Sequence, residues 1–118
     1  MKPFVLIAED ESAVSELLLY NLQKEDYEVA IAADGEEALM MIDERAPDLI
    51  LLDWMLPKVS GIEVCRRIRS GGANPNMPII MLTARSDTRE KLKALDGGAD
   101  HYLVKPVSID EHQAVLDH

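Results

Sequence analysis

Four apolar runs in this sequence are followed by side chains that could take part in chemistry. Glu9 and Asp10 follow the first run, Asp53 ends another, and Thr83 and Lys105 stand at the ends of two more. Three carboxylates brought into one cleft repel one another, and their joint ionisation becomes tolerable when a hard cation with oxygen ligands lies among them. The pattern therefore predicts a metal site, for which Mg²⁺ is the best fit.

A carboxylate beside such a cation and a lysine is able to attack a phosphoryl group. Asp10 and Asp53 are expected to bind Mg²⁺ directly, and the backbone carbonyl of Met55 would complete the protein's share of its ligands. Lys105 and the cation would offset the charge on the phosphoryl oxygens. Asp53, at the end of a run of four consecutive aliphatic residues, is the expected nucleophile.

Two further residues complete this expected site, and each candidate also has a plainer interpretation. The Thr83 hydroxyl would donate to a phosphoryl oxygen, and Ala84 is small enough to leave the nucleophile accessible. Alternatively, the acidic run 9–11 is a solvated charge run, Asp53 caps a turn, and Lys105 is a surface lysine. The phosphoryl interpretation explains in one step why four strand ends each carry a polar residue of a single site.

The residues between these side chains predict alternating strands and helices. Aliphatic runs bounded by turn residues favour buried strands, and apolar residues at helical spacing favour helices. Ser12 is the expected cap of the first helix, and Asp34 with Glu37 has the spacing of a capping box. Expected strands are 4–8, 28–32, 49–53, 78–83 and 101–104; expected helices are 12–25, 35–46, 62–70, 86–96 and a short or truncated one from 108.

This alternation predicts an α/β fold in a single domain, residues 1–118, with three layers. Strands that alternate with helices pair in parallel through right-handed crossovers. The flavodoxin-like strand order 2-1-3-4-5 is expected, because it places the three most apolar strands in the middle of the sheet. The polar residues at the strand ends would then converge on one edge.

Composition excludes several classes of protein. The chain has 118 residues, of which 47% are hydrophobic, and a net charge of −10. That charge argues against direct nucleic-acid binding, and the absence of a long apolar run argues against a membrane span or signal peptide. A cytoplasmic location is expected. Cys65, the only cysteine, is expected to lie in the core.

The motifs as a set resemble the receiver domain of two-component response regulators, over residues 4 to about 108. They are Glu9-Asp10, Asp53 within Leu-Leu-Asp-Trp-Met-Leu-Pro, Thr83-Ala84 and Lys105-Pro106. The segments 81–85 and 98–100 make the chain most similar to the OmpR/PhoB-type branch. The resemblance implies a CheY-like fold and control of transcription through a DNA-binding domain not in this chain. The alternative is a stand-alone receiver that acts through protein–protein contacts or as a phosphate sink.

The resemblance also implies roles for individual residues. A histidine kinase would pass phosphate to Asp53, with Mg²⁺, or Mn²⁺ in its place, at Asp10, Asp53 and the Met55 carbonyl, and with Glu9 reaching the ion mainly through water. Phosphorylation would draw Thr83 inward and let the Tyr102 ring follow. The bond before Pro106 would be cis. The chain would phosphorylate and dephosphorylate itself, without being an enzyme that turns over a separate substrate.

Three departures from the branch pattern bear on dimerisation. Val107 follows the Lys-Pro pair, His101 follows Gly-Ala-Asp, and the last helix is acidic where basic residues are usual. Those basic residues normally pair across a dimer face formed by the fourth helix, fifth strand and fifth helix. We therefore expect homodimerisation through that face to be weakened.

Three other functions remain open at this stage. A phosphatase with an aspartyl nucleophile would need a second aspartate two residues after Asp53, where Met55 stands. A flavin carrier would need a Ser/Thr/Gly-rich loop after the first strand, where the sequence has an acidic run. A binding module that is not phosphorylated would not need the full set of acids.

Overall fold

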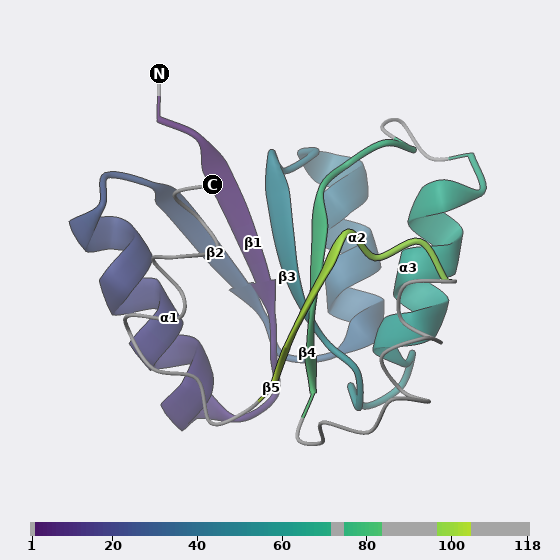
Figure 1. The fold of residues 1–118 in the computed structure, drawn as a ribbon, viewed down its shortest axis with the longest axis horizontal. Coiled ribbons are helices and arrows are strands. Elements are labelled where there is room, and N and C mark those ends of the chain that lie inside the picture. Colours follow the sequence, from purple (N-terminus) through teal and green to yellow (C-terminus); the bar gives the residue numbers. More distant parts are fainter. Residues whose placement is uncertain (1, 72–74, 84–96, 105–118) are drawn as a thin grey trace.

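The computed structural model describes residues 2–71, 75–83 and 97–104, which form a parallel sheet with helices on both faces (Figure 1). The strands are β1 (Phe4–Ala8), β2 (Glu28–Ala32), β3 (Leu49–Asp53), β4 (Ile79–Thr83) and β5 (His101–Val104). The helices are α1 (Ser12–Lys24), α2 (Gly35–Glu44) and α3 (Gly61–Arg69). The helices expected at 86–96 and from 108 onward lie outside the described residues.

The sheet has the strand order β2-β1-β3-β4-β5, and every neighbouring pair is parallel. The predicted flavodoxin-like topology is therefore confirmed. β4 begins at Ile79, one residue later than expected, because Pro78 has no N–H to donate to the ladder. The Pro78 carbonyl still accepts a hydrogen bond from Ile50 N–H at 3.1 Å.

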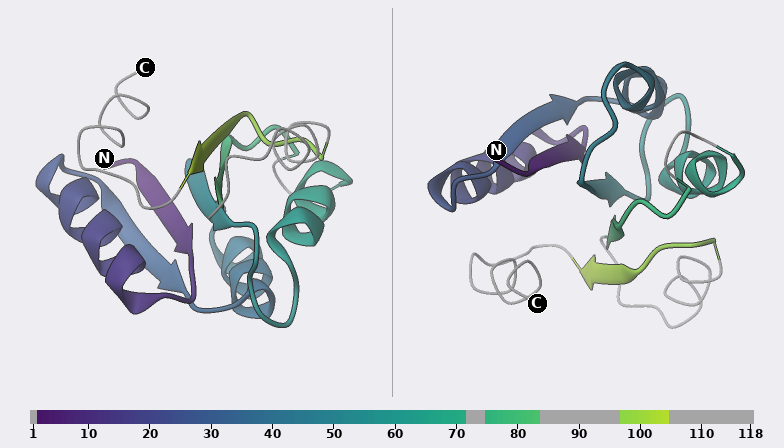
Figure 2. Two further views of the ribbon diagram at one scale, coloured as in Figure 1. Left: turned by 60° about the horizontal axis from the view of Figure 1, so that its bottom comes forward. Right: turned by 90° about the horizontal axis from the view of Figure 1, so that it is seen from above.

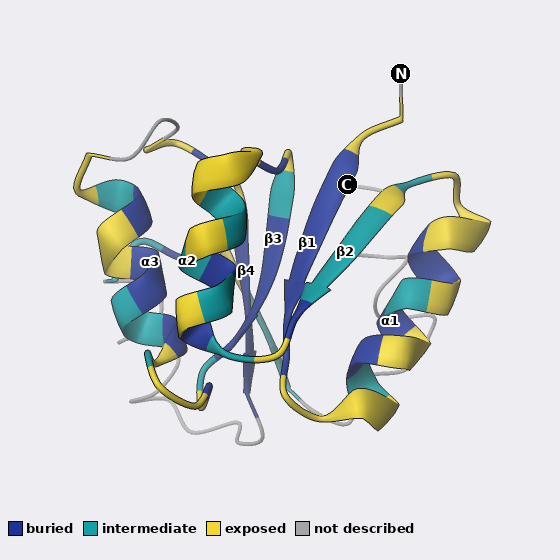
Figure 3. Cartoon of the chain, turned by 180° about the vertical axis from the view of Figure 1, so that it is seen from behind, coloured by how far each residue is buried: buried dark blue, intermediate teal, exposed yellow. Residues whose placement is uncertain are grey.

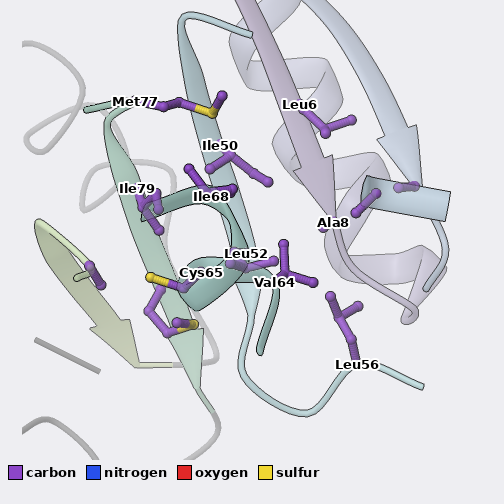
Figure 4. Close-up of a cluster of buried hydrophobic side chains, with 14 residues drawn as sticks. Leu6, Ala8, Ile50, Leu52, Leu56, Val64, Cys65, Ile68, Met77 and Ile79 are labelled. Carbon is purple, nitrogen blue, oxygen red and sulfur yellow. The ribbon is translucent and has the colours of Figure 1, made fainter. Parts of the chain in front are cut away.

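Alternate residues of the central strands enter two separate cores. Leu6 and Ala8 of β1 join side chains of β3, β4, α2 and α3 in one cluster (Figure 4). Val5 and Ile7 point to the other face and pack with Leu18 of α1. Figure 2 shows α1 on the opposite side of the sheet from α2 and α3. Both faces of the central strands are covered, which explains why their sequences are continuous aliphatic runs.

Burial falls toward the β2 edge of the sheet. β1 and β4 are buried along their whole length, whereas β2 is mostly half-buried (Figure 3). Glu28, at the exposed start of β2, forms an ion pair with Arg45. The Arg45 guanidinium also lies 4.1 Å from the centre of the Phe4 ring. These contacts join the edge strand to the end of α2.

The helix starts follow one of the two sequence signals and depart from the other. The Asp34 carboxylate caps α2 by accepting from Glu37 N–H at 2.8 Å, as expected. Ser12, the expected cap of α1, is instead its first residue, and Glu11 occupies the N-cap position without capping the helix through its side chain. Among the described residues, no helix is long and apolar enough to span a membrane.

Arg69, the last residue of α3, ties that helix to the segments that lead into β4 and β5. Its guanidinium donates to the carbonyls of Gly98 at 2.9 Å, Pro75 at 2.9 Å and Met77 at 2.6 Å. It also forms an ion pair with Asp100 at 3.0 Å. Met77, in the connection between α3 and β4, is itself buried in the core.

Candidate functional site

Three acidic side chains meet at the carboxyl edge of the sheet. Glu9 and Asp10 follow β1, and Asp53 ends β3; each offers a carboxylate oxygen, and these oxygens all lie within 4.8 Å of one another. β1 and β3 are neighbours with Ala8 opposite Leu52, so their ends lie side by side. The structure thus brings together the three acids that the sequence singled out.

The donor set of this cluster consists of oxygen atoms and suits a hard divalent cation. Glu9 is 2% exposed and Asp53 is 4% exposed, whereas Asp10 lies on the solvent side. Carboxylates removed from water are costly unless positive charge or hydrogen bonds compensate them. Mg²⁺ takes oxygen ligands and keeps several waters, so a half-open site with carboxylate donors fits it.

Backbone hydrogen bonds hold the two acids after β1. Glu9 N–H donates to the Ala32 carbonyl at 3.0 Å, which extends the pairing of β1 with β2 by one residue. The Glu9 carboxylate accepts from Glu11 N–H at 3.0 Å. Asp10 lies between these two anchored residues, so its backbone has a defined position at the rim of the cluster.

Asp53 is positioned by the end of β3 and by the first residues of the loop after it. Trp54 N–H donates to the Leu82 carbonyl at 2.8 Å, which continues the pairing with β4 past Asp53. One Asp53 carboxylate oxygen accepts from Met55 N–H at 3.3 Å. The Met55 side chain is 73% exposed, so this residue meets the site through its backbone.

Thr83 and Tyr102 lie on the two strands beyond β3. Thr83 is buried at the end of β4, directly after Leu82, the residue paired with Asp53. Tyr102 of β5 lies opposite Met81 of β4 and is half-buried against the cluster that contains Cys65. The expected site residues Ala84, Lys105 and Pro106, together with Val107, lie outside the described residues.

Asp34, just before α2, and Cys65, within α3, have shifted pKa values. The hydrogen bond from Glu37 N–H lowers the pKa of Asp34, and the nearby Lys58 ammonium lowers it further. Burial raises the pKa of the Cys65 thiol. Asp34 is therefore ionised at neutral pH beside the loop after β3. Cys65 is a neutral residue of the core, which is where the sequence placed it.

Two glycines beside the site were missed by the sequence-based reasoning. A Cβ on Gly61 would lie 2.1 Å from the Asp53 carbonyl, and a Cβ on Gly35 would lie 1.8 Å from the Val59 carbonyl. Neither glycine stands in a pattern that signals such contacts, because both contacts join the glycine to backbone distant in sequence. They emerge only once the strands and helices are packed.

A family model described as "Response regulator receiver domain" matches residues 5–117. The chain belongs to this family. It is 51% identical over 114 residues to the phosphate regulon transcriptional regulatory protein PhoB of Rhizobium meliloti, covering 97% of the chain and 50% of the relative. It is 45% identical over 114 residues to the alkaline phosphatase synthesis transcriptional regulatory protein PhoP of Bacillus subtilis, covering 97% and 47%. The resemblance to the OmpR/PhoB-type branch is thus confirmed, and this receiver domain spans about half the length of these relatives.

Solved receiver domains share the fold closely. A Francisella response regulator receiver domain is 34% identical with a TM-score of 0.90, covering 98% of this chain and 94% of that one. The receiver domain of a Pseudomonas aeruginosa sensor histidine kinase is 30% identical with a TM-score of 0.89, covering 99% and 96%. That second structure holds a magnesium ion coordinated in its active-site cleft.

Proposed function

We propose that residues 1–118 form one receiver unit that accepts a phosphoryl group from the phosphohistidine of a histidine kinase. The acceptor is Asp53, and the carrying observation is the cluster of Glu9, Asp10 and Asp53 at the carboxyl edge of the sheet. The phosphorylated unit acts in the cytoplasm. Its output is control of transcription through a DNA-binding domain outside this chain. The similarity to PhoB and PhoP, which this chain matches over about half their length, supports that output.

The proposed reaction is a transfer between two nucleophiles. An oxygen of the Asp53 carboxylate forms a bond to phosphorus while the phosphorus–nitrogen bond to the kinase histidine breaks. The electron pair of that bond returns to the imidazole ring. Asp10, Asp53 and the Met55 carbonyl hold Mg²⁺, or Mn²⁺ in its place, with Glu9 contributing through water, and the bound ion supplies positive charge to the phosphoryl oxygens.

Three further residues act on the transferred group in this proposal. Lys105 and the Thr83 hydroxyl contact phosphoryl oxygens, and Ala84 leaves room for them. A cis bond before Pro106 aims the lysine. Thr83 then moves toward the phosphate and the Tyr102 ring follows, which makes the two residues the switch that reports phosphorylation.

The unit assists its own phosphorylation and its own hydrolysis, and it turns over no separate substrate. The homodimer face in this proposal is formed by the expected fourth helix, the fifth strand and the expected fifth helix. His101, Val107 and the acidic last helix weaken the ion pairs that a symmetric homodimer would use there. We expect weak association on activation, which sedimentation with beryllofluoride would measure; a tight symmetric dimer would contradict it.

Incubation with acetyl phosphate and Mg²⁺, followed by intact mass, tests the site. One added phosphoryl group is expected, because Asp53 lies beside two further carboxylates that suit the cation. The adduct should be absent in Asp53→Ala and blocked by EDTA. Glu16→Ala, on the exposed face of α1, is the matched control and should be phosphorylated like the wild type. An adduct that persists in Asp53→Ala would overturn the assignment of the acceptor.

A further inference from the structure

The loop that follows β3 is held at both of its ends. This loop, residues 54–60, carries the Met55 carbonyl. Trp54 N–H donates to the Leu82 carbonyl at 2.8 Å, and Gly61 N–H donates to the Trp54 carbonyl at 3.1 Å. The loop therefore closes on its own first residue. Its ends alone do not fix the position of its middle, which depends on contacts with other elements.

The middle of the loop is a tight turn bound to the first turn of α2. The Pro57 carbonyl accepts from Val59 N–H at 2.8 Å and from Gly35 N–H at 3.1 Å. Lys58, between the two loop residues, has a φ of 68°. A three-residue turn with positive φ is rare and strained, so it persists where the surroundings hold it. The bond from Gly35 is one such restraint.

The close approach of the Val59 backbone explains why residue 35 is a glycine. Its backbone does not have the positive φ that would itself require glycine. A Cβ at this position would lie 1.8 Å from the Val59 carbonyl oxygen and 2.8 Å from Val59 Cβ, and real Cβ atoms essentially never approach within 3.0 Å. Because the nearest atoms belong to backbone, any side chain would force the loop and α2 apart.

We propose that Gly35 is a positioning residue for the metal site: its bare backbone clamps the loop after β3 and so sets where the Met55 carbonyl lies. This inference rests on the proposed function, in which that carbonyl is a ligand of Mg²⁺. Mg²⁺ demands nearly octahedral geometry at short distances, whereas Ca²⁺ accepts longer and more varied ones. A displaced loop therefore costs Mg²⁺ affinity more than Ca²⁺ affinity.

Titration of Gly35→Ala with Mg²⁺ and with Ca²⁺ tests the clamp. Trp54 is the only tryptophan and adjoins Asp53, so its fluorescence is the binding signal. The Kd for Mg²⁺ should rise about 10-fold, the size of effect typical when groups that orient metal ligands are changed. The Kd for Ca²⁺ should rise clearly less, so the preference for Mg²⁺ falls.

Two variants at the residues on either side of Gly35 serve as controls. Glu36→Ala places the same new residue at an exposed neighbouring position and should bind Mg²⁺ like the wild type. Asp34→Asn keeps an acceptor for Glu37 N–H but removes the charge that faces Lys58 at 3.5 Å. It leaves the Gly35 contact in place, so its preference for Mg²⁺ over Ca²⁺ should match the wild type.

The outcomes separate the clamp from the proposed function. A wild-type protein that binds no Mg²⁺ would contradict the proposed function itself. If the wild type binds Mg²⁺ and Gly35→Ala binds both ions unchanged, or loses both in equal proportion, the clamp is wrong. Should the variant not fold, hydrogen exchange of the metal-free wild type decides: protected amides at Gly35 and Val59 support a preformed clamp, and exchange at open-loop rates refutes it.

Discussion

Individual residues at the site illustrate what a single sequence can and cannot reveal. Asp53 was identifiable because an acid at the end of a buried aliphatic run is unusual, and Glu9 with Asp10 because an acidic pair follows another such run. Gly35 carried no such mark, because its requirement comes from backbone packed against it from another loop. The acids of the site can thus be recognised from their neighbours in the sequence, whereas the glycine that packs beside the site cannot.

Cys65 is expected to react slowly with thiol reagents in the folded protein. Its side chain is fully buried, its S–H donates to the Gly97 carbonyl at 3.1 Å, and burial raises its pKa. All three disfavour the reactive thiolate. At pH 8 a chromogenic thiol reagent should modify the native protein roughly 100-fold more slowly than the same protein in urea. The absorbance of the chromophore that the reagent releases measures the rate.

The same raised pKa makes stability depend on pH in the alkaline range. Folding favours the neutral Cys65 thiol, so its contribution is complete below the usual thiol pKa and declines as pH rises from there toward the raised folded value. Urea unfolding at several pH values should show this decline in the wild type and a smaller one in Cys65→Ala. Identical pH profiles in the two proteins would contradict the assignment.

At the scale of elements, the strands were more predictable than the helix ends. The central strands β1, β3 and β4 are short aliphatic runs bounded by turn residues, and their burial on two faces leaves few alternatives. The cap of α1 was misassigned, because Ser12 has the side chain of a cap but the first hydrogen bonds of the helix are accepted by the Glu11 carbonyl.

Arg69→Met is expected to lower the free energy of unfolding by about 2 kcal/mol, because three carbonyls and the Asp100 carboxylate lose a charged donor. Asp100 also accepts from Ile79 N–H at 2.8 Å, so the loss reaches the first residue of β4. Arg67→Met is the matched control. It removes an exposed ion pair with Glu63 and should cost less than about 0.5 kcal/mol. Equal midpoints in urea for the two variants would show that the Arg69 contacts do not stabilise the fold.

The fold of the whole molecule followed from the alternation of elements, whereas its output did not. Parallel pairing through right-handed crossovers leaves few topologies for five strands, and the apolar order of the strands selects one. The acid cluster is a consequence of that topology, because it joins the ends of β1 and β3, which are separated in sequence by α1, β2 and α2. What the domain controls does not follow from the topology, because receiver domains of a response regulator and of a sensor histidine kinase share it.

Because the cluster joins β1 to β3, binding of Mg²⁺ is expected to stabilise the whole fold. A ligand that binds only the folded state at ten times its Kd adds about 1.4 kcal/mol to the free energy of unfolding, which corresponds to a melting temperature higher by several degrees in a domain of this size. Thermal unfolding at increasing Mg²⁺, followed by circular dichroism, measures the gain.

The net charge of −10 requires a control for this measurement, because any added salt screens repulsion among the acids. NaCl at matched ionic strength raises the melting temperature only through that screening, so the Mg²⁺-specific gain is the difference between the two salts. Asp53→Asn removes one carboxylate from the cluster and should lose most of this difference while keeping the response to NaCl. If the difference is absent in the wild type, or survives in Asp53→Asn, the cation does not bind across the ends of β1 and β3.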